Sequence, residues 1–283
     1  MSFHSSITRL VDTRGSSEER QLVARWRPEI ESFLGAFQEG IRKDYQSLEI
    51  GLEEGLVLKL VVKRFRMPPV AGLARIAGTL PGLAGACARE VLRAGYDFHV
   101  GLRIQADRCH RELYIYDRNR EFTRFLETQV PLPPRPEGAS VVTAYGIDEQ
   151  DGVSAYLTVR KNPRVAAQLP LIGQKLEQEL RVPLGARVKD LWEHLRLQDG
   201  RWQPGKFGIE LHDLDLQLAT RIISHYRPPH FGYLVPLAEY ASIVIAGMPS
   251  GGIRGWYFTR QRTPETLSAP ARLPATGTTR ADS

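Results

Sequence analysis

Short stretches of alternating apolar and polar residues arrive in pairs along this chain, and a helical pattern separates most pairs from the next. We expect strand pairs at residues 46–52 and 57–65, 97–105 and 111–117, 139–147 and 153–161, 193–198 and 206–212, and 239–248 and 253–260. Polar or glycine-containing segments join the two strands of each pair, as in hairpin turns. Parallel βαβ units would supply one strand per helix, so the pattern excludes a doubly wound sheet.

Helical periodicity predicts helices over residues 19–43, 82–94, 119–128, 173–192 and 213–226. Pro28 marks either a kink in the first helix or the true start of that helix. Ten antiparallel strands with helices outside favour a closed barrel, because closure removes exposed sheet edges. The predicted fold class is therefore α+β: an antiparallel ten-stranded β-barrel of about five αββα repeats, with the helices outside.

The size and composition of the chain fit one globular domain. Its 283 residues are 42% hydrophobic and 25% charged, and we expect a single barrel domain over residues 19–262. Residues 1–18 and 263–283 are expected to be disordered tails, the second being rich in Pro, Ala, Ser and Thr. The sequence has no apolar signal core and no membrane-length apolar run, so we expect a cytoplasmic protein without membrane association. Two cysteines exclude a disulfide scaffold and a cysteine-built zinc site.

The alternation within the strands predicts an inverted barrel with a polar interior. Leu113 and Ile115 alternate with Glu112, Tyr114 and Tyr116, and other strands repeat this pattern. A period of two places the aliphatic set on one face and the polar and aromatic set on the other. Because helices are expected outside, the aliphatic face should meet them and the polar face should line the interior.

No short motif identifies a reaction. The chain lacks the P-loop, dinucleotide-binding, metalloprotease and serine-hydrolase signatures. The acidic run at residues 148–152 is interpreted as a hairpin turn, and His212 and Asp213 as a structural pair. Most of the 38 basic residues are arginine and the net charge is +6, which suits an anionic ligand. A nucleic-acid or other polyanion binder is one alternative, although the arginines are scattered and interleaved with acidic residues.

Several short segments, taken in order, resemble the ABBA-type prenyltransferases, and more closely the peptide prenyltransferases of cyanobactin-type pathways. They are Ser47-Leu48-Glu49, Lys59 through Arg64-Phe65, Ala144-Tyr145-Gly146-Ile147-Asp148, Tyr156 through Pro163, Pro236-Leu237, and Ser242 through Gly247. The resemblance spans roughly residues 27–262, and order and spacing carry it rather than any single motif. It implies prenyl transfer from an isoprenyl diphosphate, with the dimethylallyl donor favoured over geranyl and with Mg²⁺ bound to the diphosphate. No protein ligand is assigned to that Mg²⁺.

The resemblance also implies roles for individual residues. Glu49 matches the carboxylate that takes the acceptor's proton. The residues expected to bind the diphosphate are Lys59, Arg64, Arg103, Arg160 and Arg260. The residues expected to shield the carbocation are Tyr114, Tyr116, Tyr156 and Trp256, since aromatic rings stabilise cations and exclude water. The sequence does not decide whether Lys63 or Arg64 faces the interior, because a shift of one residue in the strand register moves every side chain to the other face of the sheet.

The chain departs from the family pattern at several positions. Tyr156 and Thr158 stand where His and Arg are expected, and Glu210 stands where Tyr is common. An inward carboxylate is costly unless it is paired, so we hypothesise that Glu210 binds an acceptor carrying Arg or another basic nitrogen. Ile245 is expected to shorten the donor pocket and to favour a five-carbon chain.

The sequence therefore predicts a prenyltransferase that modifies a side chain of a ribosomal, cyanobactin-like peptide, linear or macrocyclic. We expect an isoprenyl diphosphate and a peptide as its partners, with no nucleic acid and no membrane. Two alternatives stay open beside the polyanion binder. One is an ABBA prenyltransferase of a small aromatic metabolite, and the other is a non-catalytic barrel that presents a peptide to another enzyme.

Overall fold

The fold is taken from a computed structural model of the chain. It describes residues 3–42, 46–53, 55–64, 70–134, 141–158, 167, 169–185, 188–212, 214, 216–226, 230–234, 242–247 and 253–259. The predicted tail at 263–283 lies outside these residues. In the part of the chain that the structure describes, no helix combines the length and the apolar character that crossing a bilayer requires.

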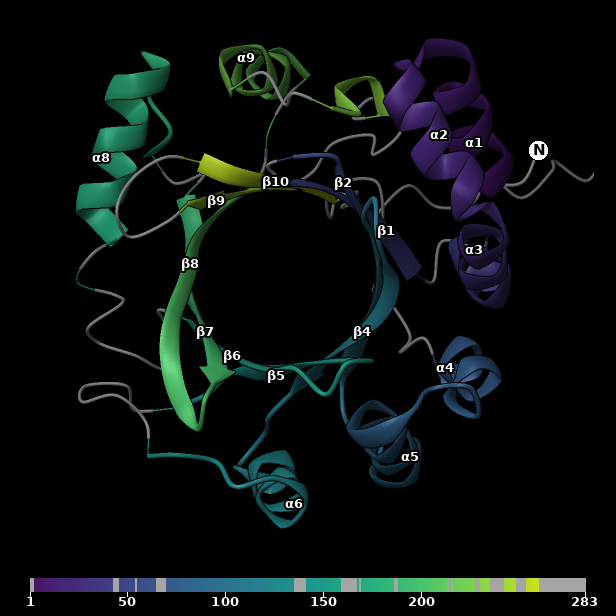
Figure 1. Cartoon of the computed structure of the whole chain (residues 1–283). Helices are drawn as coiled ribbons and strands as arrows, with labels where there is room; N and C mark the ends of the chain where they lie inside the picture. Colours follow the sequence, from purple (N-terminus) through teal and green to yellow (C-terminus); the bar gives the residue numbers. More distant parts are fainter. Residues whose placement is uncertain are drawn as a thin grey trace, which may run out of the picture.

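Antiparallel strands form one curled sheet whose ladder returns to its start. The strands are β1 (Gln46–Glu53), β2 (Val57–Arg64), β3 (Phe98–Ile104), β4 (Cys109–Tyr116), β5 (Ala144–Asp148), β6 (Val153–Thr158), β7 (Val188–Gln198), β8 (Arg201–His212), β9 (Ser242–Gly247) and β10 (Ile253–Thr259). They pair in the order β1-β10-β9-β8-β7-β6-β5-β4-β3-β2, and β1 also pairs with β2 (Figure 1). Each predicted hairpin is present, with its ends shifted by a few residues.

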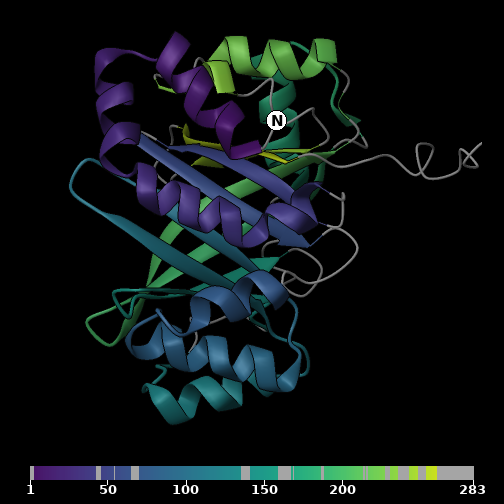
Figure 2. The ribbon, with the colours of Figure 1, turned by 90° about the vertical axis from the view of Figure 1, so that its right-hand side faces the viewer.

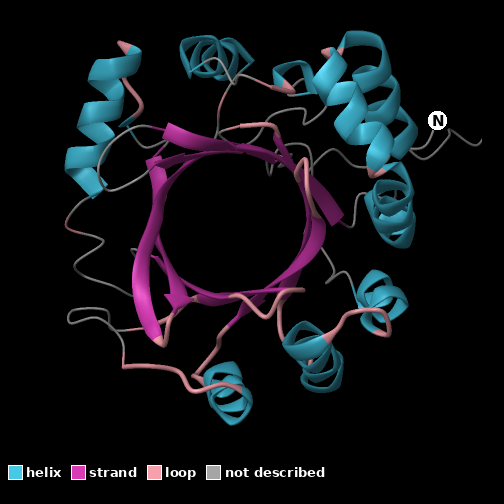
Figure 3. Cartoon of the chain, in the orientation of Figure 1, coloured by secondary structure: helices cyan, strands magenta, loops and turns pink. Residues whose placement is uncertain are grey.

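Helices surround the sheet and leave its inner face uncovered (Figure 3). They are α1 (Phe3–Arg14), α2 (Ser17–Arg25), α3 (Arg27–Arg42), α4 (Val70–Ala77), α5 (Gly82–Ala94), α6 (Glu121–Gln129), α8 (Leu169–Leu180) and α9 (Leu216–Tyr226). Figure 2 shows the strands crossing obliquely beneath them, with α1–α3 over the upper part and α4–α6 over the lower part of the outer surface. The predicted α+β class, an antiparallel sheet with external helices, is confirmed.

The hydrophobic core lies between the helices and the outer face of the sheet. Leu58, Val100 and Ile115 are fully buried there, together with Cys87 and Phe122 from the helices. Each buried large aliphatic side chain stabilises the fold by about 1.5–3 kcal/mol relative to leaving it in water. The predicted inversion is therefore correct for these strands, because their aliphatic residues meet the helices.

The N-terminal residues correct one prediction. Residues 3–14 form helix α1 rather than a disordered tail, and its Ile7 and Val11 are fully buried. Phe3, Ile7, Leu10 and Val11 recur at helical spacings of three and four, so local periodicity is sufficient to identify this segment as a helix. Helices α2 and α3 pack against it. The expected long first helix is divided at Trp26 into α2 and α3. Pro28 falls in the first turn of α3 and thus marks a helix start.

The fourth hairpin corrects a second prediction. The helix expected over 173–192 ends at Leu180, and β7 begins at Val188. Arg181, the residue directly after the helix, adopts a left-handed backbone angle with φ of 53°, and this ends the helix at Leu180. The apolar residues of β7 recur at spacings compatible with either a helix or a strand, which is why periodicity alone misassigned this segment.

Candidate active site

The strand register decides which side chains face the barrel interior. Lys59 on β2 lies opposite Arg103 on β3, which lies opposite His110 on β4. Paired residues share a face of the sheet. These polar residues therefore point away from the helices, and the aliphatic residues beside them point outward.

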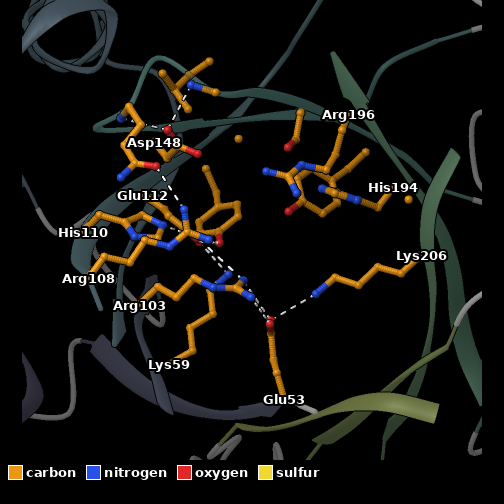
Figure 4. Close-up of a pocket in the computed structure, with 18 of the residues that line it drawn as sticks. Glu53, Lys59, Arg103, Arg108, His110, Glu112, Asp148, His194, Arg196 and Lys206 are labelled. Atoms are coloured by element: carbon orange, nitrogen blue, oxygen red, sulfur yellow. Dashed lines mark hydrogen bonds and ion pairs between the residues drawn. The ribbon is translucent and has the colours of Figure 1, made fainter. Parts of the chain in front are cut away.

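Cations and carboxylates inside the barrel form one connected network. The Lys59 ammonium lies 2.5 Å from a carboxylate oxygen of Glu112. Arg103 and Lys206 reach Glu53 from opposite walls, as Figure 4 shows, and the Lys206 Nζ to Glu53 Oε1 distance is 3.1 Å. Arg103 donates two hydrogen bonds to Glu53. The network thus gathers charged groups from β1, β2, β3, β4 and β8.

This network borders a cavity of about 460 Å³ near the hairpin turns of β3–β4, β5–β6 and β7–β8. Five cationic side chains face it against three carboxylates, so the lining favours an anion. The charged or titratable lining residues are Glu53, Lys59, Arg103, Arg108, His110, Glu112, Tyr114, Asp148, Tyr156, His194, Arg196 and Lys206. A diphosphate group is the kind of ligand for which such a concentration of cations is suited.

Aromatic rings line the wall next to these cations. The rings of Tyr114 and Tyr156 lie 5.9 Å apart between centroids, and Tyr156 contacts Trp192 at 5.6 Å and His194 at 4.9 Å. The Lys59 ammonium sits 5.0 Å from the centre of the Tyr114 ring. This wall places π faces beside the cationic groups, which suits a cation formed beside a leaving anion.

Charge pairing and burial shift the acidity of these groups. Burial alone would raise the pKa of Glu112, but Lys59, His110 and Arg103 together hold it well below its usual range. Burial lowers the pKa of Lys206 although Glu53 opposes the change. Burial, followed by nearby Glu112 and Glu53, raises the pKa of Tyr156 above its usual range. At neutral pH the cavity therefore presents an ionised Glu112 and a neutral tyrosine.

A second cluster lies further along the interior. Glu49 on β1 is paired with Lys63 on β2, and the Tyr116 ring meets the His99 ring edge-to-face, with centroids 5.1 Å apart. Burial lowers the pKa of Lys63, but Glu49 and then Glu210 outweigh this and raise it. Burial raises the pKa of Tyr116. Glu49, Lys63, Tyr116 and Glu210 thus interact electrostatically, and none of them lines the cavity described above.

The structure divides the predicted site residues between the cavity and the second cluster. Lys59, Arg103, Tyr114 and Tyr156 all line the cavity, whereas Glu49, Tyr116 and Glu210 belong to the second cluster. At the open register position, Lys63 faces inward and pairs with Glu49. The expected position of Arg64 in the interior is therefore corrected, because strand alternation places Arg64 on the opposite face of β2 from Lys63.

Two other predicted residues take positions on the outer face. Ile245 pairs with Trp256, and Trp256 pairs with Leu52, which is buried against the helices. Residues on one register row share a face, so the expectation that Ile245 and Trp256 face the interior is corrected. The side chains of Arg64, Ile245 and Trp256 are not described, and Arg160 and Arg260 lie outside the described residues.

Several residues of the site escaped the sequence prediction. Glu53, His110 and Glu112 follow the same alternation that selected Glu49 and Tyr114, so strict use of period two identifies them. His194 and Lys206 lie where the β7–β8 register shifts, and there alternation gives no reliable face.

Comparisons with known proteins agree with this architecture. No protein-family model and no curated protein matches the sequence. Among solved structures, a 6-dimethylallyl tryptophan synthase matches at 14% identity, covering 92% of this chain and 96% of that chain, with a TM-score of 0.54.

Two further solved structures match over similar lengths. A 6-dimethylallyltryptophan synthase from Micromonospora olivasterospora, in complex with DMASPP and Trp, shares 14% identity over 92% of this chain and 97% of that chain, with a TM-score of 0.46. NotF in complex with brevianamide F and DMSPP shares 10% identity over 92% of this chain and 99% of that chain, with a TM-score of 0.44. The chain thus shares its fold with a dimethylallyl tryptophan synthase.

Proposed function

We propose that this chain is an ABBA-type prenyltransferase that moves a dimethylallyl group from its diphosphate to a small aromatic acceptor. The observation that carries this proposal is the cation-rich cavity beside a tyrosine wall inside the fold. A fold likeness to a 6-dimethylallyl tryptophan synthase supports the same reaction class. An isoprenyl diphosphate needs an anion site for its charged end and a π-lined space for its allylic end, and this cavity offers both.

The proposed reaction begins at the diphosphate. Its bond from carbon to oxygen breaks, and the electron pair leaves with the diphosphate, which Lys59, Arg103 and Lys206 stabilise electrostatically. The allylic cation then lies against the rings of Tyr114 and Tyr156, which delay its capture by water. An aromatic carbon of the acceptor attacks it and forms the new bond between carbon atoms.

A base must then remove the proton from the acceptor ring. We assign this step to Glu49, whose carboxylate is buried and held by Lys63. A positioned carboxylate of this kind contributes typically about 10²–10⁴-fold to a proton transfer. Glu210 acts on the same lysine and supplies a negative charge for a basic nitrogen of the acceptor.

The acceptor distinguishes this proposal from the peptide modification that the sequence predicts. The name of the solved structure with a shared fold indicates an aromatic amino acid as substrate, and no comparison supports a peptide. A tryptophan-like acceptor would combine an electron-rich ring with an ammonium for Glu210. The ribosomal peptide substrate and its basic acceptor stay a prediction that the same experiment tests.

Mg²⁺ is proposed to arrive bound to the diphosphate. Glu53 and Glu112 are the buried carboxylates nearest the cations, and both are already engaged by lysine or arginine. Among the described residues, no group of three or more His, Cys, Asp or Glu side chains could hold a metal ion. The diphosphate oxygens would therefore supply the ligands, and the ion would neutralise leaving-group charge. Turnover measured with added Mg²⁺ and with EDTA tests this.

The proposed function is tested by incubating the purified protein with dimethylallyl or geranyl diphosphate and a panel of acceptors. The panel contains tryptophan, free indoles and phenols, and linear and cyclic peptides. Mass spectrometry should detect one added five-carbon unit on the aromatic small molecules, and the adduct should be lost in Glu49→Ala. Adducts on peptides alone would favour the peptide reading, and no adduct on any acceptor would contradict prenyl transfer.

A further inference from the structure

Glu53, the last residue of β1, is a carboxylate that two cations of the cavity share. Its Oε1 atom accepts one hydrogen bond from Arg103 Nη1 at 3.2 Å and another from Lys206 Nζ at 3.1 Å. Its Oε2 atom accepts a hydrogen bond from Arg103 Nη2. Arg103 on β3 and Lys206 on β8 come from different walls of the barrel, and Glu53 Oε1 lies where they converge (Figure 4).

This position of Glu53 Oε1 is also suited to an oxygen of a bound diphosphate. Guanidinium and ammonium groups bind phosphate by donating hydrogen bonds to its anionic oxygens. The side chains of Arg103 and Lys206 are 23% and 20% exposed and both line the cavity, whereas that of Glu53 is 8% exposed. A diphosphate that reaches both cations must therefore compete with Glu53 for the same donors.

The balance of charge makes this competition strong. Lys59 is held by Glu112, and Glu53 is shared by Arg103 and Lys206, so these three cations face two carboxylates. A diphosphate carries more than one negative charge, and a carboxylate that stayed among the same cations would repel it. A glutamate side chain turns about three single bonds, so its carboxylate can move away while the backbone of β1 stays in place.

We propose that Glu53 is an internal competitor of the diphosphate, which bridges Arg103 and Lys206 in the free protein and is displaced from them when the substrate binds. This role rests on the proposed diphosphate substrate. No covalent bond forms or breaks in the exchange. Glu53 is thus a positioning residue that returns to the two cations as the diphosphate product leaves, and this return favours release of that product.

Titration calorimetry with inorganic pyrophosphate tests the exchange in the wild type, Glu53→Gln and Glu53→Asp. Glutamine keeps the shape of the side chain and removes its charge. Aspartate keeps the charge but is one methylene too short to hold both cations. A hydrogen bond to a charged group is stronger than a neutral one, so Glu53→Gln should bind pyrophosphate roughly 10- to 100-fold more tightly than the wild type. Glu53→Asp should change the affinity in the same direction.

The pH and the control variant isolate the effect of Glu53 on the cations. Burial lowers the pKa of Lys206 and Glu53 opposes this change, so the titrations are run at pH 6.5 to favour the charged form of Lys206 in every variant. Glu90→Gln removes a carboxylate on α5 that pairs with Arg93 instead of with a cation of the cavity. This control should bind pyrophosphate as the wild type does.

The three binding constants distinguish competition from two other roles of Glu53. If Glu53 acted only through its charge, Glu53→Asp would bind pyrophosphate as the wild type does. If Glu53 only held the cations in a binding geometry, both variants would bind pyrophosphate more weakly. Either result would overturn the proposal, and so would a lack of pyrophosphate binding in all three proteins.

A crystal structure of the wild type with pyrophosphate is a second measurement, which needs no variant to fold. One phosphate oxygen should lie within hydrogen-bonding distance of both Arg103 and Lys206, and the Glu53 carboxylate should lie beyond that distance from Lys206. A Glu53 carboxylate that still bridged the two cations beside bound pyrophosphate would contradict the displacement.

The outcome is separable from that of the proposed function. Prenylated product, together with a pyrophosphate affinity that Glu53→Asp leaves unchanged, would overturn the role of Glu53 and leave the reaction standing. Tighter pyrophosphate binding in both Glu53 variants, without any prenylated product, would support the competition and contradict prenyl transfer.

Discussion

The Lys59 ammonium lies 2.5 Å from the Glu112 carboxylate inside the barrel, where the two side chains are 7% and 12% exposed. This pair connects β2 to β4 across the intervening β3. Removing one partner of a buried ion pair leaves an uncompensated charge in a poorly solvated site.

Lys59→Met should therefore destabilise the fold by about 3–5 kcal/mol. The double variant Lys59→Met/Glu112→Gln should recover much of this, because it removes both charges. Urea unfolding monitored by tryptophan fluorescence measures both. Arg27→Ala, which breaks a partly exposed pair with Asp12, is the control and should leave stability nearly unchanged. Equal losses in the single and double variants would argue against coupling between Lys59 and Glu112.

Glu49→Gln should separate catalysis from binding. The substitution keeps the shape of the side chain and removes the basic oxygen, so kcat should fall by about 10²–10⁴ while KM for the donor changes little. Steady-state kinetics with dimethylallyl diphosphate and the best acceptor measure both constants. Glu90→Gln, at a buried helix position far from the interior face, serves as the matched control. An unchanged kcat in Glu49→Gln would remove Glu49 from the chemistry.

Tyr156→Leu should increase the capture of the allylic cation by water. Its ring faces Tyr114, Trp192 and His194, and a leucine keeps bulk but loses the π face. A lost cation–π contact of about 1–2 kcal/mol corresponds to roughly a tenfold change in the ratio of dimethylallyl alcohol to prenylated product. Tyr156→Phe keeps the ring and should keep the wild-type ratio. If both variants gave the same ratio, the ring would have no shielding role.

Gly208→Ala should displace the Trp192 ring, which belongs to the aromatic wall of the cavity. A Cβ atom at this position would lie 2.0 Å from the Trp192 ring, so the indole, which contacts the Tyr156 ring, must shift. Overpacking of this kind typically costs about 1–3 kcal/mol, and tryptophan fluorescence should shift with it. Gly173→Ala on α8 is the matched control, since its nearest atom would lie at 3.8 Å. This control should leave stability unchanged or raise it slightly.

Acid should destabilise the protein partly through His194. Its pKa is lowered to about 3 by burial and by nearby cations, whereas an unfolded histidine titrates near 6.5. Between these values the unfolded chain binds a proton that the folded chain does not, so stability falls as pH drops. The loss reaches about 2 kcal/mol at pH 5.

His194→Gln should reduce the difference in unfolding free energy between pH 7 and pH 5, because glutamine does not titrate. Urea unfolding at the two pH values measures it, with His225→Gln as the exposed control. A variant with the same pH dependence as the wild type would show that His194 has the same pKa in the folded and in the unfolded chain.

Several features of this protein followed from its sequence alone, because they depend on local pattern. The alternation of Leu113 and Ile115 with Glu112 and Tyr114 predicts both the strand β4 and its two faces. The segment 82–94 predicts helix α5 with its correct ends, and Gly95 terminates that helix with a φ of 74°. Turn residues and a period of two are properties of neighbours in the chain, so they can be recognised without the fold.

Other features depended on partners distant in sequence. The choice between Lys63 and Arg64 required the pairing of β1 with β2, since a shift of one residue exchanges the faces. Lys206 and His194 required the bulge between β7 and β8, which interrupts the alternation that otherwise assigns a face. The sequence thus determined the strands and the polar character of the interior. The tertiary structure alone decided which charges meet, because ion pairs such as Lys206 with Glu53 join residues that only the closing of the sheet brings together.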